Sequence, residues 1–175
     1  MLRVLRPEAS RNWTVRAAGL EWSCWTTAVH VAHDLLAYSG QLAGEARSRY
    51  LRFDLSVSDD STPSDLLDVV GMTGAILATV VSSADPSARA WHYGSTDPVG
   101  FAAMGVGETI VHTFDIAEGL GLAWQAPSDL CLFVLDRLFP GWPPGDPVDV
   151  LLWSTGRRPL GDAAPVAEWV WKAAR

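Results

Sequence analysis

The stretch DPVGFAAMGVGETIVHTFDIAEGLG, residues 97–121, decides the fold. Its opening Asp-Pro is a start signal for a helix, and the two glycines at its end are typical of a helix terminus. We therefore expect a long helix from Asp97 to about Glu118. Glu108 and His112 lie four residues apart in it, so their side chains share one face about one turn from each other.

The rest of the chain predicts three further helices. The first begins near Ser23, whose hydroxyl can cap free amides, and the second begins at Pro63, which suits a first helical turn. Four helices with modest connections are typical of an all-α four-helix bundle, and we expect a single domain over residues 1–175. The predicted helices cover residues 23–42, 63–83, 97–118 and 126–139, with a short additional helix at 148–154.

Four segments lie outside these helices. Residues 1–21 carry little periodicity and are expected to form an N-terminal arm, and residues 140–175 are expected to form a short C-terminal extension. Residues 50–57 alternate in a way that favours a short extended segment. Residues 89–97 are predicted to be a loop.

Composition excludes several classes of protein. A formal net charge of −7 opposes binding to nucleic acid, because that affinity rests on lysines and arginines that neutralise phosphates. Two cysteines, Cys24 and Cys131, are too few for a disulfide framework, so we expect a cytoplasmic protein in which Cys24 is a small buried residue. The longest near-apolar run, residues 69–81, is shorter than the ~18 residues of a membrane span, so no membrane is expected. The sequence leaves open whether the chain forms a homodimer.

A metal site is the chemistry that the helix at 97–118 favours. Glu108 and His112 can both reach one divalent ion if a neighbouring helix supplies a third ligand, and His30 and His33 are the candidates. The alternative is an exposed ion pair on a solvated face. The apolar flanks favour burial, and a buried Glu and His need partners or a metal. Asp115 continues the same stripe, either to orient the imidazole or as an exposed carboxylate.

Several motifs carry a resemblance to a known family. The segments 20–38, 91–94, 97–105 and 107–115 resemble the mycothiol-dependent maleylpyruvate isomerase N-terminal domain, a branch of the DinB-like four-helix metalloproteins. Residues 151–157, LLWSTGR, resemble a C-terminal motif of its actinobacterial members. The resemblance covers most of the chain.

The resemblance implies a divalent metal, usually zinc, held by one histidine of the first helix together with Glu108 and His112. The family pattern places a tryptophan eight residues before that histidine, which fits Trp22 with His30 or Trp25 with His33. We prefer His30, because its surroundings match better, and His33 is the alternative. Characterised relatives use the metal to bind and activate a low-molecular-weight thiol, such as mycothiol, for isomerisation of or S-transfer to a small electrophile.

One departure from the family concerns the C-terminus. The isomerases carry a further C-terminal domain that contributes to the active site, whereas only residues 140–175 follow the fourth helix here. Maleylpyruvate isomerisation is therefore not the expected reaction. Arg157 and Arg158 are candidates for a bidentate carboxylate clamp or for surface residues. A metal-dependent hydrolase and a non-catalytic module that binds a small ligand are the alternative functions.

Overall fold

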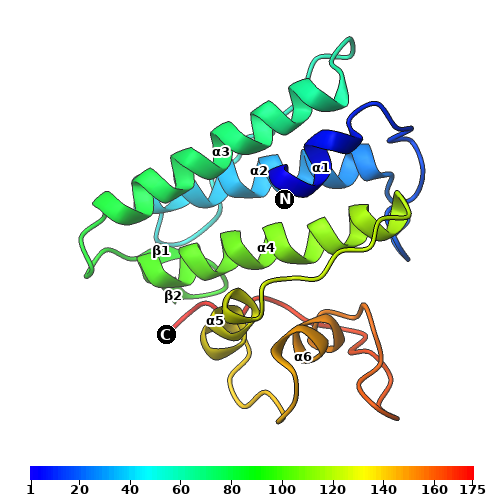
Figure 1. The fold of residues 1–175 in the computed structure, drawn as a ribbon. Helices are drawn as coiled ribbons and strands as arrows, with labels where there is room; N and C mark the ends of the chain where they lie inside the picture. The colour runs from blue at the N-terminus through cyan, green and yellow to red at the C-terminus, as the bar shows by residue number, and fades with distance from the viewer.

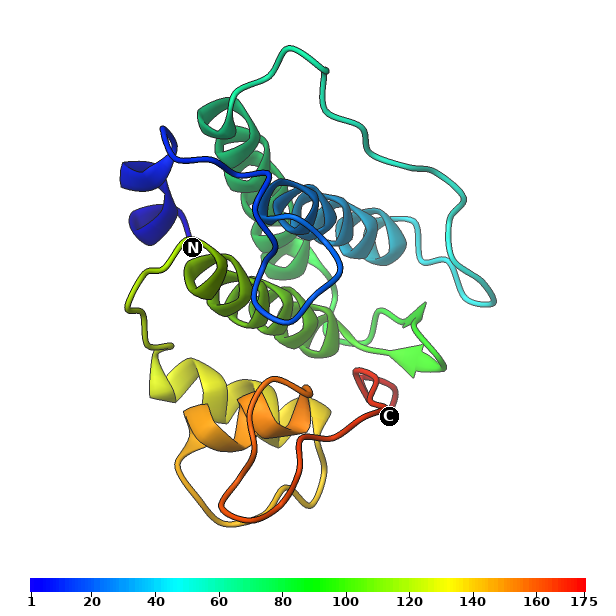
Figure 2. The ribbon, with the colours of Figure 1, turned by 90° about the vertical axis from the view of Figure 1, so that its right-hand side faces the viewer.

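A central helix, α4 (Pro98–Gly119), lies between two layers in this computed structural model, which describes residues 1–175. The helices α2 (Cys24–Ala43) and α3 (Pro63–Ser83) pack on one side, and α5 (Ser128–Leu138) and α6 (Pro147–Ser154) lie on the other (Figures 1 and 2). The mostly helical fold class and the predicted helices are confirmed. The remaining elements are α1 (Leu2–Leu5), the 3-10 helix η1 (Arg6–Glu8), β1 (Ala90–Trp91) and β2 (Ser95–Thr96).

The two layers differ in direction. In Figure 1 the helices α2, α3 and α4 run across the page, whereas α5 and α6 are seen nearly end-on. After the rotation in Figure 2, α5 and α6 run across the page instead. The pair α5 and α6 therefore crosses α4 at a steep angle and covers its face away from α3.

Each long helix starts where its capping residues predict. The hydroxyl of Ser23 accepts a hydrogen bond from the backbone N–H of Thr26 at 3.0 Å. Thr62 and Asp65 form a capping box ahead of α3, and Asp97 accepts the N–H of Gly100 at 2.7 Å. These caps satisfy amides that have no partner inside the helix.

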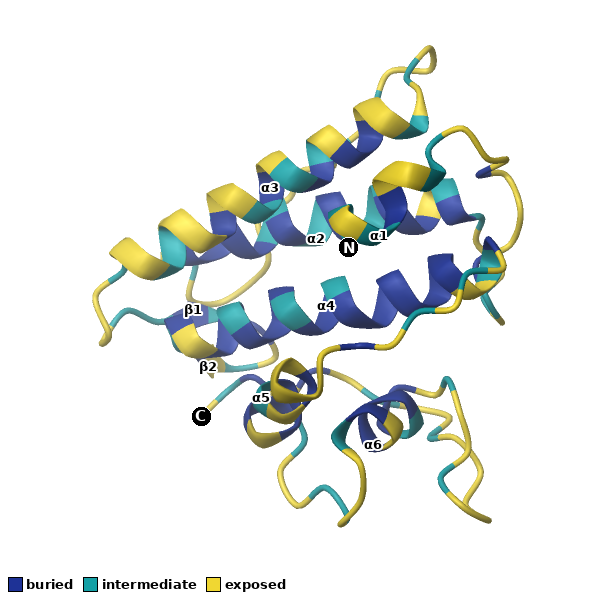
Figure 3. Ribbon diagram, viewed as in Figure 1, coloured by how far each residue is buried: buried dark blue, intermediate teal, exposed yellow.

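Nearly the whole surface of α4 is buried (Figure 3). Small residues let its neighbours approach closely. A Cβ added at Gly105 would collide with Leu77 of α3, and a Cβ added at Gly119 would collide with the backbone of Arg16. The glycines of α4 thus position the layers around the predicted site.

The N-terminal arm is anchored more firmly than its sequence indicates. Leu5, Trp13 and Ala17 are buried, and the indole N–H of Trp13 donates to the carbonyl of Glu8 at 3.0 Å. Apolar burial therefore orders a segment that has no periodic pattern of its own.

Two other predicted segments differ in the structure. Residues 51–58 form no strand, so the predicted extended segment has no sheet partner, although the N–H of Leu51 donates to Oε1 of Gln41 at 3.1 Å. The predicted loop 89–97 contains a small antiparallel hairpin of β1 and β2. Its turn places Tyr93 at φ 52° and Gly94 at φ 150°.

The C-terminal tail packs against the core through Trp171 and Ala173 before it ends at the exposed Arg175. It runs past α5 toward the hairpin (Figure 1). The guanidinium Nη2 of Arg137 donates to the carbonyl of Ala173 at 2.8 Å, and the N–H of Arg175 donates to the carbonyl of Ser95 at 3.0 Å. These bonds hold the tail beside α4 and bury the side chain of Trp171.

The helix α3 is long and apolar enough to cross a membrane by length and composition alone. The apolar run at residues 69–81 is thus part of a longer helix, and the length argument against a membrane span does not apply to it. One face of the helix packs in the core, as in many core helices, through Leu66, Leu67, Val70, Thr73 and Leu77.

Candidate metal centre

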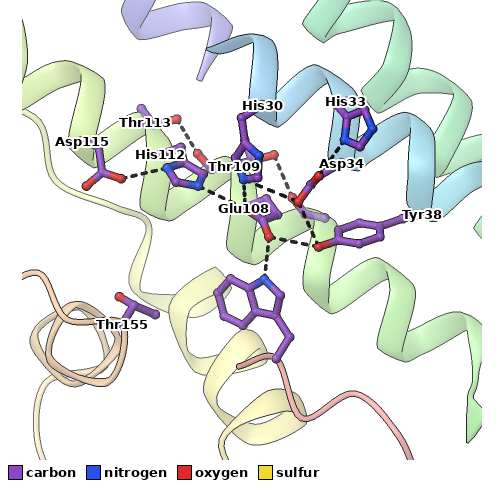
Figure 4. Close-up of polar contacts among 12 residues, drawn as sticks. His30, His33, Asp34, Tyr38, Glu108, Thr109, His112, Thr113, Asp115 and Thr155 are labelled. Carbon is purple, nitrogen blue, oxygen red and sulfur yellow. Dashed lines mark hydrogen bonds and ion pairs between the residues drawn. The ribbon is translucent and has the colours of Figure 1, made fainter. Parts of the chain in front are cut away.

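The structure brings His30, Glu108 and His112 together at the contact between α2 and α4 (Figure 4). Glu108 and His112 are 5% and 6% exposed, which rules out the alternative of a solvated surface pair. One nitrogen of each histidine and one carboxylate oxygen of Glu108 all lie within 4.8 Å of one another. The three residues predicted as ligands therefore converge on one point.

The distances between these atoms suit a small cation. Oε2 of Glu108 lies 3.3 Å from Nε2 of His112 and 3.7 Å from Nε2 of His30. In a tetrahedral zinc site with bonds of ~2.0–2.2 Å, neighbouring ligand atoms are about 3.3–3.6 Å apart. The observed spacing is close to that geometry.

The other oxygen of Glu108 is already occupied by two neutral donors. The hydroxyl of Tyr38 donates to Oε1 at 3.0 Å, and the indole N–H of Trp171 donates to the same atom at 2.6 Å. Burial raises the pKa of Tyr38 well above its usual value, so the hydroxyl keeps its proton. Only Oε2 of Glu108 is left to face the two histidines.

The pKa values of Glu108 and His112 are shifted more by their hydrogen bonds and neighbouring charges than by burial. Burial alone would raise the pKa of Glu108, but the hydrogen bonds and charges of His112 and His30 hold it well below its usual range. Burial alone would lower the pKa of His112, but Asp115 and Glu108 raise it to about 9. A carboxylate and an imidazolium are the stable forms here.

Asp115 fixes the orientation of His112 through a hydrogen bond to its ring. Nδ1 of His112 donates to Oδ2 of Asp115 at 2.8 Å, which directs Nε2 toward Glu108. Asp115 is fully buried, so the alternative of an exposed carboxylate is wrong. Its own charge is balanced by Arg157, whose Nε and Nη2 donate to the two carboxylate oxygens at 3.1 and 2.7 Å.

The two arginines at 157 and 158 therefore have different roles. Arg157 makes the bidentate clamp that its chemistry predicts, but the carboxylate it holds is an internal one. Arg158 is 46% exposed and lies 3.4 Å from Glu118, as expected of a surface residue.

His33 lies outside the cluster, although it is only three residues after His30. Its Nδ1 donates to Oδ1 of Asp34 at 3.0 Å, and its ring packs near Phe53 with centroids 5.9 Å apart. Trp22 instead packs against His30 with ring centroids 4.9 Å apart, which agrees with the preferred register.

Asp34 is a close neighbour of the cluster. Its Oδ2 lies 3.5 Å from Nε2 of His30 and accepts the Tyr38 hydroxyl at 3.4 Å. Burial and the charge of Glu108 raise the pKa of Asp34. The ligand prediction from the sequence did not include Asp34 or Tyr38, and no local pattern points to Trp171.

Cys24 is buried, as predicted. Burial raises the pKa of its thiol to about 11, so the thiol stays protonated and unreactive at neutral pH.

A comparison with models of protein families, with curated proteins and with solved structures finds no match for this chain. The candidate metal centre is therefore argued from its own residues and geometry.

Proposed function

We propose that this chain binds a divalent metal ion, zinc in the first instance, through His30, Glu108 and His112. The observation that carries the proposal is the convergence of two imidazole nitrogens and one carboxylate oxygen within 4.8 Å at a buried position. Two nitrogens and one oxygen are a common ligand set for zinc, and three protein ligands are typical of a reactive site with an open position.

Residues around the ligands support the same proposal. Metal-bound histidines usually donate their second ring nitrogen to a carboxylate, as His112 does to Asp115. The donors Tyr38 and Trp171 hold Oε1 of Glu108, so this carboxylate would bind through Oε2 alone. A metal would also balance the buried negative charge of Glu108, whose Oε2 now faces His30 and His112.

For the reaction, we propose a thiol-dependent transferase or isomerase that acts on a small electrophile, with mycothiol as the thiol. The basis is the motif resemblance to DinB-like mycothiol-dependent proteins. A bound zinc ion lowers the pKa of a thiol and keeps the thiolate in a fixed position. Under this proposal His30, Glu108 and His112 hold the ion, while Asp115 keeps His112 oriented. A cytoplasmic location is part of the proposal.

Metal content tests the foundation of this proposal. We expect about one zinc per chain in the wild type and negligible metal in His112→Ala, since a site with three protein ligands loses most of its affinity with one of them. The matched control is His33→Ala, which removes a histidine of α2 that lies outside the cluster and should keep the metal. Equal, negligible metal in wild type and His112→Ala would contradict the proposal.

Turnover then distinguishes the reactions. Loss of 1-chloro-2,4-dinitrobenzene that depends on added mycothiol and on His112 is the result expected of a thiol transferase. Hydrolysis of p-nitrophenyl acetate that needs His112 but no thiol would assign a metal-dependent hydrolase instead. A zinc-loaded protein with neither activity, and with every coordination position filled by protein, would assign a non-catalytic module.

A further inference from the structure

A cavity of about 440 Å³ opens beside the candidate metal centre. Asp34 and Glu108 form part of its wall, and Asp34 in turn lies 3.5 Å from His30. The volume lies within the range of ~300–1,000 Å³ that is typical of small-molecule sites. This cavity therefore offers space for a substrate next to the proposed ligands.

Aromatic rings dominate the wall of this cavity. They come from α2, from the segment after it, from the hairpin and from the C-terminal tail. Trp169 and Trp171 meet at 67° with centroids 4.8 Å apart, and Tyr50 meets Tyr93 edge-on at 6.2 Å. A flat aromatic guest can make further contacts of this tilted, edge-to-face kind with the same rings. The aromatic lining residues are Tyr38, Tyr50, Phe53, Tyr93, Trp169 and Trp171.

An anionic guest finds no counter-charge in this wall. No lysine or arginine lines the cavity, and the buried guanidinium of Arg157 is bound to Asp115 elsewhere. Burial lowers the pKa of His92 in the wall to about 4, so this imidazole is neutral at pH 7. Without a metal at the candidate centre, a carboxylate or phosphate would thus lie unpaired beside Asp34 and Glu108, which is costly.

A cationic guest finds carboxylates that already have contacts within the protein. Oε1 of Glu108 accepts two hydrogen bonds, and Oε2 faces the histidines. Oδ1 of Asp34 accepts the ring N–H of His33 at 3.0 Å, and Oδ2 lies within 3.5 Å of His30 and Tyr38. A cation would have to compete with these contacts.

From these observations we propose that the cavity takes an uncharged, flat aromatic molecule. The inference rests on the proposed function in one respect: the bound molecule is a substrate only if the metal centre is reactive. The binding preference itself is a property of the cavity and is measured separately.

Three probes with one naphthalene body test the preference by titration calorimetry on the full chain treated with a chelator, so that no ion can bind the carboxylate probe, with metal content measured before the treatment. They are 2-naphthalenemethanol, 2-naphthoate and 2-naphthylmethylammonium. The alcohol should bind with a Kd at least about tenfold below that of either ion, because a buried unpaired charge is penalised. Tighter or equal binding of the carboxylate, or of the ammonium ion, would overturn the uncharged class.

Two variants test whether the probe binds in the cavity. Tyr93 is 64% exposed, so Tyr93→Ala removes a wall ring without disturbing the core. We expect it to weaken binding of the alcohol about threefold or more, because an aromatic contact is lost. The control Leu132→Ala changes a side chain on α5 that is 39% exposed and outside the cavity, and it should leave the Kd unchanged. Equal effects of both variants would overturn the proposed location. Absence of metal with the expected order of probes would refute the proposed function alone.

Discussion

Trp171 donates its indole N–H to Oε1 of Glu108 at 2.6 Å across 63 residues of sequence. The tryptophan belongs to the C-terminal tail, while the carboxylate belongs to the central helix α4. This bond, with the one from Tyr38, fixes which oxygen of Glu108 faces His30 and His112. The tail is thus part of the candidate metal centre.

The first prediction concerns this bond. Trp171→Phe keeps an aromatic ring but removes the donor, so Glu108 can rotate and the zinc affinity should fall about 10–100-fold, as for other residues that orient ligands. Competition with a chromophoric zinc chelator measures it. The control Trp142→Phe removes a comparable bond to Asp136 outside the site and should not change the affinity. Equal affinities in wild type and Trp171→Phe would contradict the role of the tail.

A second prediction concerns the space that Trp171 occupies. A Cβ added at Gly107 would lie 2.9 Å from Cη2 of Trp171, which is closer than side chains tolerate. Gly107→Ala should therefore displace the tail and lower the free energy of unfolding by about 1–3 kcal/mol, with weaker zinc binding. Urea unfolding measures the stability. Gly19→Ala is the control, because nothing lies within 4 Å of its added Cβ. Unchanged stability and affinity in Gly107→Ala would show that the tail adjusts freely.

The adjacent arginines give a third prediction. Arg157→Met removes the bidentate one of the two cations paired with the buried Asp115 and leaves only His112, so it should lower the free energy of unfolding by about 3 kcal/mol. Arg158→Met removes an exposed pair with Glu118 and should change it by less than about 1 kcal/mol. Thermal and urea unfolding compare the two. A loss in Arg157→Met as small as the one expected for Arg158→Met would mean that Asp115 does not need Arg157.

The fourth prediction is a pH dependence of metal binding. His112 must lose its proton to bind a metal, and its pKa in the metal-free protein is about 9. Zinc affinity should therefore rise with pH up to about 9, by at most about tenfold per pH unit for this proton. Calorimetry in buffers of different ionisation enthalpy counts the protons released. An affinity that is flat between pH 7 and 9 would contradict the raised pKa.

The same pKa has the opposite effect on the stability of the metal-free protein. The folded-state value of about 9 lies above the ordinary value of 6.5, so the stabilisation from protonated His112 is full below pH 6.5 and is lost as pH rises through about 9. Urea unfolding of the metal-free protein between pH 6.5 and 9.5 measures it. His112→Gln should flatten the curve over this range.

Local patterns in the sequence were sufficient to predict the helices and the pairing of Glu108 with His112 as candidate ligands. The caps at Ser23, Thr62 and Asp97 act within one turn, so the helix starts can be predicted from neighbouring residues. The spacing of Glu108 and His112 likewise follows from the period of one helix. The choice of His30 over His33 needed the family pattern as well.

Only the tertiary structure determined the surroundings of those ligands. The contacts of Trp171 with Glu108, and of Arg157 with Asp115, join residues 63 and 42 apart, and no local period encodes them. They form because α5, α6 and the tail fold back over the glycine-lined face of α4. The sequence by itself therefore determined which residues are available as metal ligands. Packing of distant segments decided how those ligands are oriented, which charges are balanced internally and which cavity lies beside them, because burial and close approach depend on the whole chain.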